Sequence, residues 1–357
     1  MSIWWTLWVV YTLCWPAFLG LDVGYYLHLV RGQARIVLNQ QPIEKLLRRP
    51  DLDASVREKL RLVQEIRQFA QGEIGLSRSD NYTTFFDTGD GPVSWNLTAC
   101  PRDRLQPVRW QYPVVGSAPY RGYFDRDRAE REQAKLEAKG YDTYLRPVNA
   151  YSTLGWLRDP VLSPMLRYRD EALADVLIHE LTHATVWVPG HVPFNESLAT
   201  FVGETGSLIW LEMRYGPGSS VVKEAYDLRA DQRLFADFMQ RIIRGLEALY
   251  GRNLPYGEKL RQRQTVFDGA RDSFVSLPLR TNAYQSFPGW ELNNARMVAY
   301  RAYHSGPEVF ESVYRAVGRD LRAAVAVFRG CENAEDPMAY LEGWLQTHKP
   351  GLRGSDP

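Results

Sequence analysis

The pentapeptide His-Glu-Leu-Thr-His at positions 179–183 constrains the fold of this chain more than any other feature. Its two histidines are one helical turn apart, so on a helix both imidazoles point to one side and can bind a single Zn²⁺ ion. Glu180 lies beside them, where a carboxylate can act on a metal-bound water molecule. The alternative is a pair of structural histidines with ordinary hydrogen-bond partners. The pattern therefore predicts a helix with a zinc site on one side.

Apolar residues recur at helical spacing around this motif and predict a largely buried helix over about 171–187. They form one stripe, made of Leu173, Leu177, Leu181, Ala184 and Val188. His179 and His183 fall on the opposite side, and little charge follows Asp175 apart from Glu180. Because unpaired polar groups on a buried helix are costly, the two imidazoles and the carboxylate need partners. A metal ion satisfies all three.

A catalytic zinc ion usually takes three protein ligands and leaves a fourth position for water, and Glu196 is the candidate for the third. Residues 188–193 contain two prolines and a glycine, which predict a tight reversal of the chain. Asn195 is then expected to cap a second helix that runs to about Met213. Such a helical hairpin would bring Glu196 back over the two histidines.

The second helix carries small residues on the side of Glu196, among them Thr200, Gly203 and Ser207, and these would let the two helices approach closely. Glu204 lies on the same side. It is expected to hydrogen-bond a ligating histidine, and the alternative is a solvated or capping carboxylate. Glu204 could also hold the amino terminus of a substrate, although a single sequence does not show that it does.

The HExxH motif followed by Asn-Glu-x-x-Ala on the next helix resembles the gluzincin metallopeptidases, relatives of thermolysin, with the connection reduced to a turn. A closer resemblance, spread over most of the chain, is to a bacterial family of predicted aminopeptidases. It is carried by the segments 24–33, 42–47, 120–124, 150–156, 179–183, 194–202 and 293–296. The resemblance implies a zinc-dependent peptidase with a gluzincin-like, thermolysin-like core.

The expected mechanism follows from these parts. Zinc held by His179, His183 and Glu196 lowers the pKa of its bound water to about 7. Glu180 takes the proton as this water attacks a peptide carbonyl, and then passes it to the departing amine. In gluzincins a downstream tyrosine or histidine often stabilises the oxyanion, which makes Tyr300 a candidate.

Tyr303 and His304 are further candidates for the oxyanion role, and all three residues could equally be packing or surface groups. The resemblance also implies a substrate-binding strand. Thermolysin-like enzymes carry an Asn-Ala-x edge strand before the zinc helix, and Asn149, Ala150 and Tyr151 match it. An added peptide strand needs such an edge. The alternative is an ordinary sheet strand with Tyr151 in the core.

The remaining pattern predicts an α+β, helix-dominated fold with a small sheet before the zinc helix. Short strands and turns are expected within 80–125. Helices are expected at 53–71, 125–139, 221–249, 257–274, from about 293, and at about 307–328 and 335–347. Residues 23–357 are interpreted as a single metallopeptidase domain with a helical C-terminal part. The net charge of +1 provides no basic face, so nucleic acid is not an expected partner.

Residues 1–22 are expected to form an apolar membrane anchor or an uncleaved signal. Ser2 to Leu21 contain no charged side chain and include four tryptophans, and this length can span a bilayer. Arg31 and Arg35 follow the segment, which favours a cytoplasmic domain, whereas the resemblance favours the cell envelope. We expect a membrane-anchored domain on the periplasmic side.

Two questions stay open in the sequence. Cys100 and Cys331 could form a single disulfide or remain two buried thiols. The chain could be an active zinc peptidase acting on peptide substrates, or a membrane-bound peptide-binding or assembly protein that keeps the fold and metal without hydrolysis. An intact Glu180 favours the peptidase, because a non-catalytic protein has no chemical need for that carboxylate.

Overall fold

The computed structural model describes residues 22–89, 91–112, 116–149, 158–301 and 308–348. Its α-helices are α2 (Val23–Asn39), α3 (Ile43–Leu47), α4 (Ala54–Gly72), α5 (Arg126–Ala138), α6 (Asp170–His183), α7 (Val192–Tyr215), α8 (Ser220–Tyr250), α9 (Tyr256–Phe274), α10 (Asn294–Arg301), α11 (Glu308–Ala316), α12 (Leu321–Arg329) and α13 (Pro337–Thr347). Its strands are β1 (Gln41–Pro42), β2 (Thr84–Phe86), β3 (Ser94–Pro101), β4 (Trp110–Tyr112), β5 (Gly116–Ala118), β6 (Arg121–Tyr123), β7 (Tyr141–Val148) and β8 (Val161–Leu162). The helix-dominated α+β prediction is confirmed.

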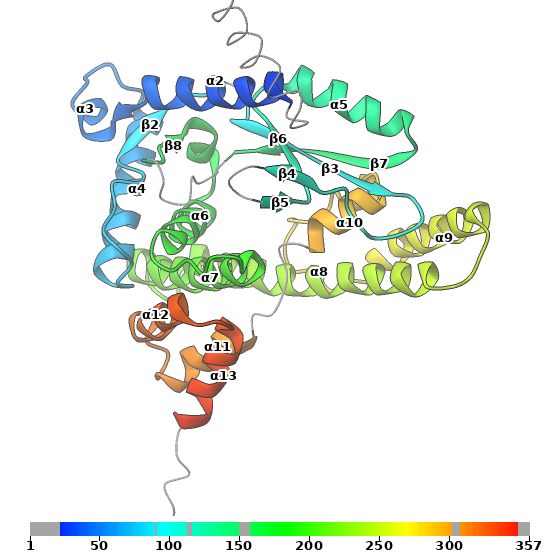
Figure 1. Ribbon diagram of the computed structural model, residues 1–357. Coiled ribbons are helices and arrows are strands. Elements are labelled where there is room, and N and C mark those ends of the chain that lie inside the picture. The colour runs from blue at the N-terminus through cyan, green and yellow to red at the C-terminus, as the bar shows by residue number, and fades with distance from the viewer. Residues whose placement is uncertain (1–21, 90, 113–115, 150–157, 302–307, 349–357) are drawn as a thin grey trace, which may run out of the picture.

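The main sheet precedes α6 in the chain and has the antiparallel order β6-β3-β7. β3 pairs with β7 along its whole length, from Ser94 opposite Val148 to Pro101 opposite Tyr141. Helices α5 and α10 both pack on these strands (Figure 1). A second sheet has the order β1-β2-β8, with β2 parallel to β8, and β4 pairs with β5 alone. The expected small sheet is therefore present, accompanied by two smaller ones.

Helices α6, α7 and α8 form the layer below the sheets (Figure 1), and α6 and α7 lie against each other along their length. Their apolar residues join the largest hydrophobic core, which also receives side chains from α4, α11, α12 and α13. A second core lies between α8, α9 and α10, and a third between α2, α5 and the main sheet. The hairpin of α6 and α7 thus lies where the largest core is built.

Two helix predictions are wrong in their boundaries. The segment 307–328 is not one helix, because α11 ends at Ala316 and α12 begins at Leu321. Between them Gly318 and Arg319 adopt positive φ angles of 75° and 61°, which a continuous helix does not allow. Helix α6, expected over about 171–187, ends at His183. The helices expected at 53–71, 125–139, 221–249 and 257–274 are found within a residue or two of those limits.

The structure describes both of the cysteines left open by the sequence, but not the expected N-terminal anchor. Cys100 and Cys331 are free and buried, so the alternative of two thiols is confirmed. Burial raises the pKa of each thiol to about 12, which keeps both protonated at neutral pH. The expected anchor covers residues 1–22, which lie outside the described part of the chain except for Asp22. None of the described helices combines the length and apolar character needed to cross a bilayer.

Candidate metal centre

Helix α6 carries both histidines, and its sequence explains why it forms. Leu173, Leu177 and Leu181 on its apolar side are completely buried, which anchors the helix in the core. The helix begins with two acidic residues, Asp170 and Glu171, which interact favourably with the positive end of the helix dipole. The opposite side is consequently held in a fixed orientation toward α7.

The turn between α6 and α7 corrects the role expected of Asn195. Helix α7 begins at Val192 and its N-cap is His191, four residues before the predicted cap, so Asn195 lies inside the first turn of the helix instead of capping it. Its buried side chain accepts a hydrogen bond from the Val188 backbone N–H at 2.9 Å and donates one to the Val188 carbonyl at 2.8 Å. Asn195 therefore clamps the turn and fixes the position of the next residue, Glu196.

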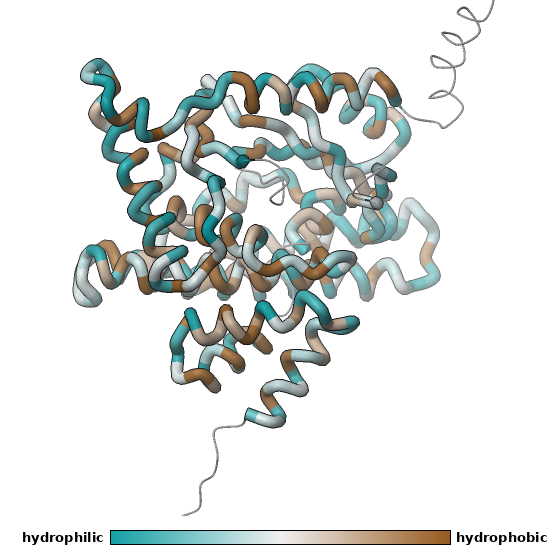
Figure 2. Tube along the Cα trace, turned by 60° about the vertical axis from the view of Figure 1, so that its left-hand side comes forward, coloured by the Kyte–Doolittle hydropathy of each residue, from teal (hydrophilic) through white to brown (hydrophobic). Residues whose placement is uncertain are grey.

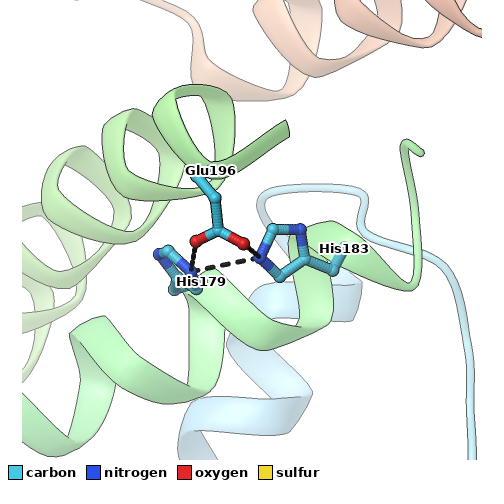
Figure 3. A group of neighbouring side chains, drawn as sticks. All are labelled: His179, His183 and Glu196. Atoms are coloured by element: carbon cyan, nitrogen blue, oxygen red, sulfur yellow. Dashed lines mark hydrogen bonds and ion pairs between the residues drawn. The ribbon is translucent and has the colours of Figure 1, made fainter. Parts of the chain in front are cut away.

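The hairpin brings His179, His183 and Glu196 together, as Figure 3 shows. The two Nε2 atoms are 3.2 Å apart. The Glu196 carboxylate lies 3.7 Å from His179 Nε2 through one oxygen and 3.6 Å from His183 Nε2 through the other. All three side chains thus direct a donor atom toward one point between the two helices.

These distances fit a Zn²⁺ ion. Donors about 2.0–2.1 Å from a tetrahedral zinc ion are about 3.3 Å from one another. The two Nε2 atoms are 3.2 Å apart, each lies 3.6–3.7 Å from a different oxygen of Glu196, and one donor atom from each residue lies within 4.8 Å of the other two. Two imidazoles and one carboxylate are also a donor set found in catalytic zinc sites. The three residues can therefore hold the metal and leave a fourth position for water.

The protonation states of His183 and Glu196 suit metal binding. Burial, together with the nearby charge of His179, lowers the pKa of His183 to about 4, so this imidazole is neutral at pH 7. Burial acts to raise the pKa of Glu196, but His179 and His183 outweigh it and the net shift is downward. For His179 burial acts to lower the pKa, and the hydrogen bond to Glu196 together with the charge of Glu180 raises it overall. A neutral imidazole and an ionised carboxylate are the forms that bind metal.

The close approach of α6 and α7 depends on Gly203. A Cβ atom there would lie 2.6 Å from Asp175 Oδ1, 2.9 Å from the Asp175 carbonyl oxygen and 3.1 Å from His179 Cβ. The two distances to Asp175 are shorter than those that real Cβ atoms show, the one to His179 is tight, and the carbonyl oxygen belongs to the backbone of α6. The prediction that small residues let the helices approach closely is confirmed at this position.

Arg229 of α8 is the main residue of this region that the sequence did not reveal. Its side chain is only 5% exposed and contacts three carboxylates: Glu171 at 2.6 Å, Asp175 at 3.1 Å and Glu204 at 3.2 Å. The cluster joins α6, α7 and α8 one turn before His179. Its partners are 25 to 58 positions away in the chain, so no local pattern could indicate it.

The cluster also shows where Glu204 lies. Its carboxylate is engaged with Arg229, and burial raises its pKa. The positive charge of His179 acts to lower the pKa of Glu204, which indicates that the two residues are near each other. The hydrogen bond between Glu204 and a ligating histidine stays a prediction.

The other predicted site residues are placed as follows. Glu180 lies on α6 between the two histidines and is half-buried. Tyr300 lies on α10 within the second core, with its ring centroid 5.9 Å from that of Phe235. Asn149 directly follows β7. Ala150, Tyr151, Tyr303 and His304 fall outside the described residues. The roles of Tyr300 and Asn149 stay predictions.

Comparison with known proteins gives a family match. The model of the family described as "Putative aminopeptidase" matches residues 24–337, which is most of the chain and includes the whole hairpin. No curated protein and no solved structure matches. The family match agrees with the resemblance seen in the sequence, and the gluzincin-like core stays a prediction.

Proposed function

Because the chain belongs to the "Putative aminopeptidase" family, we propose that it is a zinc-dependent peptidase that removes residues from the amino terminus of peptides. The observation that carries this proposal is the convergence of His179, His183 and Glu196 on one point, with Glu180 on the same helix. A structural histidine pair needs neither a third donor nor an adjacent carboxylate, whereas peptide hydrolysis at a metal uses both.

In this proposal, each residue has a separate task. His179, His183 and Glu196 would hold Zn²⁺, which when bound polarises a carbonyl and makes water a stronger acid. Glu180 accepts a proton from the attacking water and delivers it to the departing amine. Tyr300 is retained as a donor to the oxyanion. The fixed hairpin keeps these groups in place, so little reorganisation accompanies the reaction.

The substrate is proposed to bind as an added strand. Among the described residues β7 pairs only with β3, so its other edge carries backbone groups that an extended peptide could pair with. Asn149 continues from the end of this strand toward Ala150 and Tyr151. Backbone hydrogen bonds along β7 would bind peptides of varied sequence. The side chains of each peptide would then determine how well it is accepted as a substrate.

We also propose that the protein works in the cell envelope. Its N-terminal segment would anchor it to a membrane, with the folded domain on the periplasmic side. The uncharged stretch before Asp22 supports the anchor. The positions of Arg31 and Arg35 oppose the periplasmic orientation, and accessibility of the domain to protease added outside spheroplasts tests it.

The test is cleavage of a peptide library by the zinc-loaded protein and by Glu180→Gln. The proposal predicts that the substitution lowers kcat by about 10²-fold or more while one zinc ion per chain is retained. Glu130→Gln, an exposed change on α5, is the matched control and should leave cleavage intact. Zinc binding without cleavage of any peptide by the unaltered protein would contradict the proposal and favour the non-catalytic peptide-binding alternative.

Acetylation of the peptides separates the two kinds of peptidase. An aminopeptidase recognises the free amino terminus, so acetylated peptides should not be cleaved. Cleavage of acetylated peptides at internal bonds, still dependent on Glu180, would keep the zinc peptidase and replace the aminopeptidase assignment by an endopeptidase.

A further inference from the structure

Helix α2 has two apolar sides, and among the described residues one side is packed while the other is exposed. On the inner side Tyr25 and Ile36 are buried, and Gly32 packs against the ring of Phe124. The His28 Nε2 atom accepts a hydrogen bond from the Phe124 backbone N–H at 2.9 Å. These contacts fix the helix on β6, α5 and the adjoining core, and they determine which side faces outward.

The outward side is a continuous apolar stripe. A surface helix ordinarily carries polar residues on the side away from the core. Here the outward positions follow helical spacing and are exposed to the following extents: Val23 44%, Leu27 64%, Val30 66%, Val37 39% and Leu38 81%. Figure 1 shows α2 along the upper edge of the molecule, and Figure 2 shows apolar residues recurring along it. Five large apolar side chains in one row exceed what scattered surface residues account for.

The charge of α2 indicates what kind of surface the stripe fits. The helix contains no aspartate or glutamate between Val23 and Asn39. Arg31 and Arg35 are both exposed and lie along one flank of the stripe. An apolar side bordered by arginines, without acidic residues, is the composition of helices that lie in the plane of an anionic lipid surface. A protein partner of this chemistry would need an acidic rim as well as an apolar groove.

The preceding chain points to the same occupant. Residues 1–21 contain no charged side chain, include four tryptophans and end one residue before α2 begins. Tryptophan concentrates at membrane–water interfaces. If this segment enters a bilayer, the first turn of α2 must lie at the bilayer surface, because only Asp22 separates the two. Asp22 is paired with Arg121 of β6 at 2.7 Å, so the junction is tied to the folded domain.

We propose that α2 lies flat in the headgroup region of an anionic phospholipid bilayer, with Val23, Leu27, Val30, Val37 and Leu38 inserted toward the acyl chains. The arginines on its flank contact lipid phosphates. The domain is thereby held in one orientation on the membrane through the rigid contacts of α2 with β6 and α5. This inference is independent of the proposed peptidase activity.

Spin labels on the full-length chain test the proposal. Leu27→Cys and Leu38→Cys are prepared in a Cys14→Ser background, in which Cys100 and Cys331 are buried and unreactive toward the label. Val275→Cys, an 82% exposed apolar position at the end of α9, is the matched control. Each protein is reconstituted into vesicles of phosphatidylcholine and phosphatidylglycerol. The measured quantity is the ratio of label accessibility to oxygen and to a water-soluble nickel complex.

The proposal predicts that vesicles raise this ratio severalfold at positions 27 and 38 and leave it unchanged at 275. Arg31→Glu/Arg35→Glu should reduce the rise at both positions, and thermal melting shows whether that variant is folded. Labels at 27 and 38 that stay accessible to the nickel complex in vesicles would overturn the proposal. Labels shielded from both reagents, with or without vesicles, would also overturn it and assign the stripe to residues 1–21 or to a second copy of the chain.

Discussion

At the residue scale, the position of Glu196 depends on the side chain that precedes it. The Asn195 side chain makes hydrogen bonds to both the backbone N–H and the carbonyl of Val188. These buried groups therefore do not require a water molecule as a partner. The third metal donor follows directly in sequence. A residue that looks like a helix cap in the sequence therefore acts as a clamp that positions the metal centre.

Asn195→Ala should destabilise the protein by about 1–3 kcal/mol, because it leaves the buried Val188 N–H without a partner and the Val188 C=O with only the His191 N–H. It should also weaken zinc binding about 10-fold or more, as changes to residues that support metal ligands do. Urea denaturation and competition with a zinc chelator measure the two effects. Asn282→Ala, an exposed loop change, is the control. Unchanged zinc affinity in a folded Asn195→Ala protein would show that the clamp does not position Glu196.

Glu171 gives a prediction about pH. Burial raises its pKa, an effect that Arg229 only partly opposes, so the folded state binds this proton more tightly than the unfolded chain does. The contribution of Glu171 to the free energy of unfolding is therefore greatest at low pH. It decreases as the pH rises above about 4, the ordinary pKa range of glutamate. Glu171→Gln removes the ionisation and should raise the melting temperature at pH 7.

The difference in melting temperature between Glu171→Gln and the unaltered protein should shrink toward pH 4, where Glu171 is neutral in both states. Melting curves across this pH range check the sign. A variant less stable than the unaltered protein at pH 7 would show that the ion pair with Arg229 stabilises the ionised form more than burial opposes it.

At the element scale, the α6–α7 hairpin was the most predictable part of the molecule. Its signals are local: histidine spacing, an apolar stripe, and a turn rich in proline and glycine. The errors were also local in origin. The segment 307–328 keeps helical spacing across Gly318. The positive φ angles of Gly318 and Arg319, together with the extended Asp320 that caps α12, separate α11 from α12. Apolar periodicity identifies helices well and locates their ends poorly, because the ends depend on backbone hydrogen bonds that side-chain pattern does not specify.

Gly203→Ala tests the packing of the hairpin. The added methyl group would meet the Asp175 carbonyl and the Cβ of His179, so the helices must separate, at a cost of about 1–3 kcal/mol. Zinc affinity should fall with it, because His179 moves relative to Glu196. Gly269→Ala is the matched control: it lies in α9 with nothing within 4 Å of an added Cβ, and it should stabilise the protein by about 0.5–1 kcal/mol. Equal effects of the two substitutions on denaturation would contradict the close-packing account.

At the scale of the whole molecule, the features that sequence could not reveal are those that join distant elements. Arg229 on α8 gathers carboxylates from α6 and α7. Asn294 on α10 donates to the Pro101 carbonyl at the end of β3. The spacing of residues in the sequence does not indicate these contacts, because each contact joins elements that meet only when the helices and strands pack. Sequence therefore predicts the three residues that come together as the candidate metal centre and the order of elements, but not the contacts that hold these residues against their surroundings.

Arg229→Met tests the importance of the buried cluster. Removing the cation leaves Glu171, Asp175 and Glu204 close together without a counter-charge, so the free energy of unfolding should fall by about 3–5 kcal/mol. Arg244→Met, an exposed change on the same helix, is the control and should be nearly neutral. Chemical denaturation at pH 7 measures both. A near-neutral Arg229→Met would mean that the carboxylates bind protons readily enough to replace the arginine.

The central claim is that His179, His183 and Glu196 together bind one zinc ion. Anomalous diffraction from crystals of the zinc-loaded protein, collected on both sides of the zinc absorption edge, tests it most directly. The account predicts one strong peak within bonding distance of both Nε2 atoms and the Glu196 carboxylate, lost in His183→Ala. A peak elsewhere in the molecule, or none between these three side chains, would contradict it.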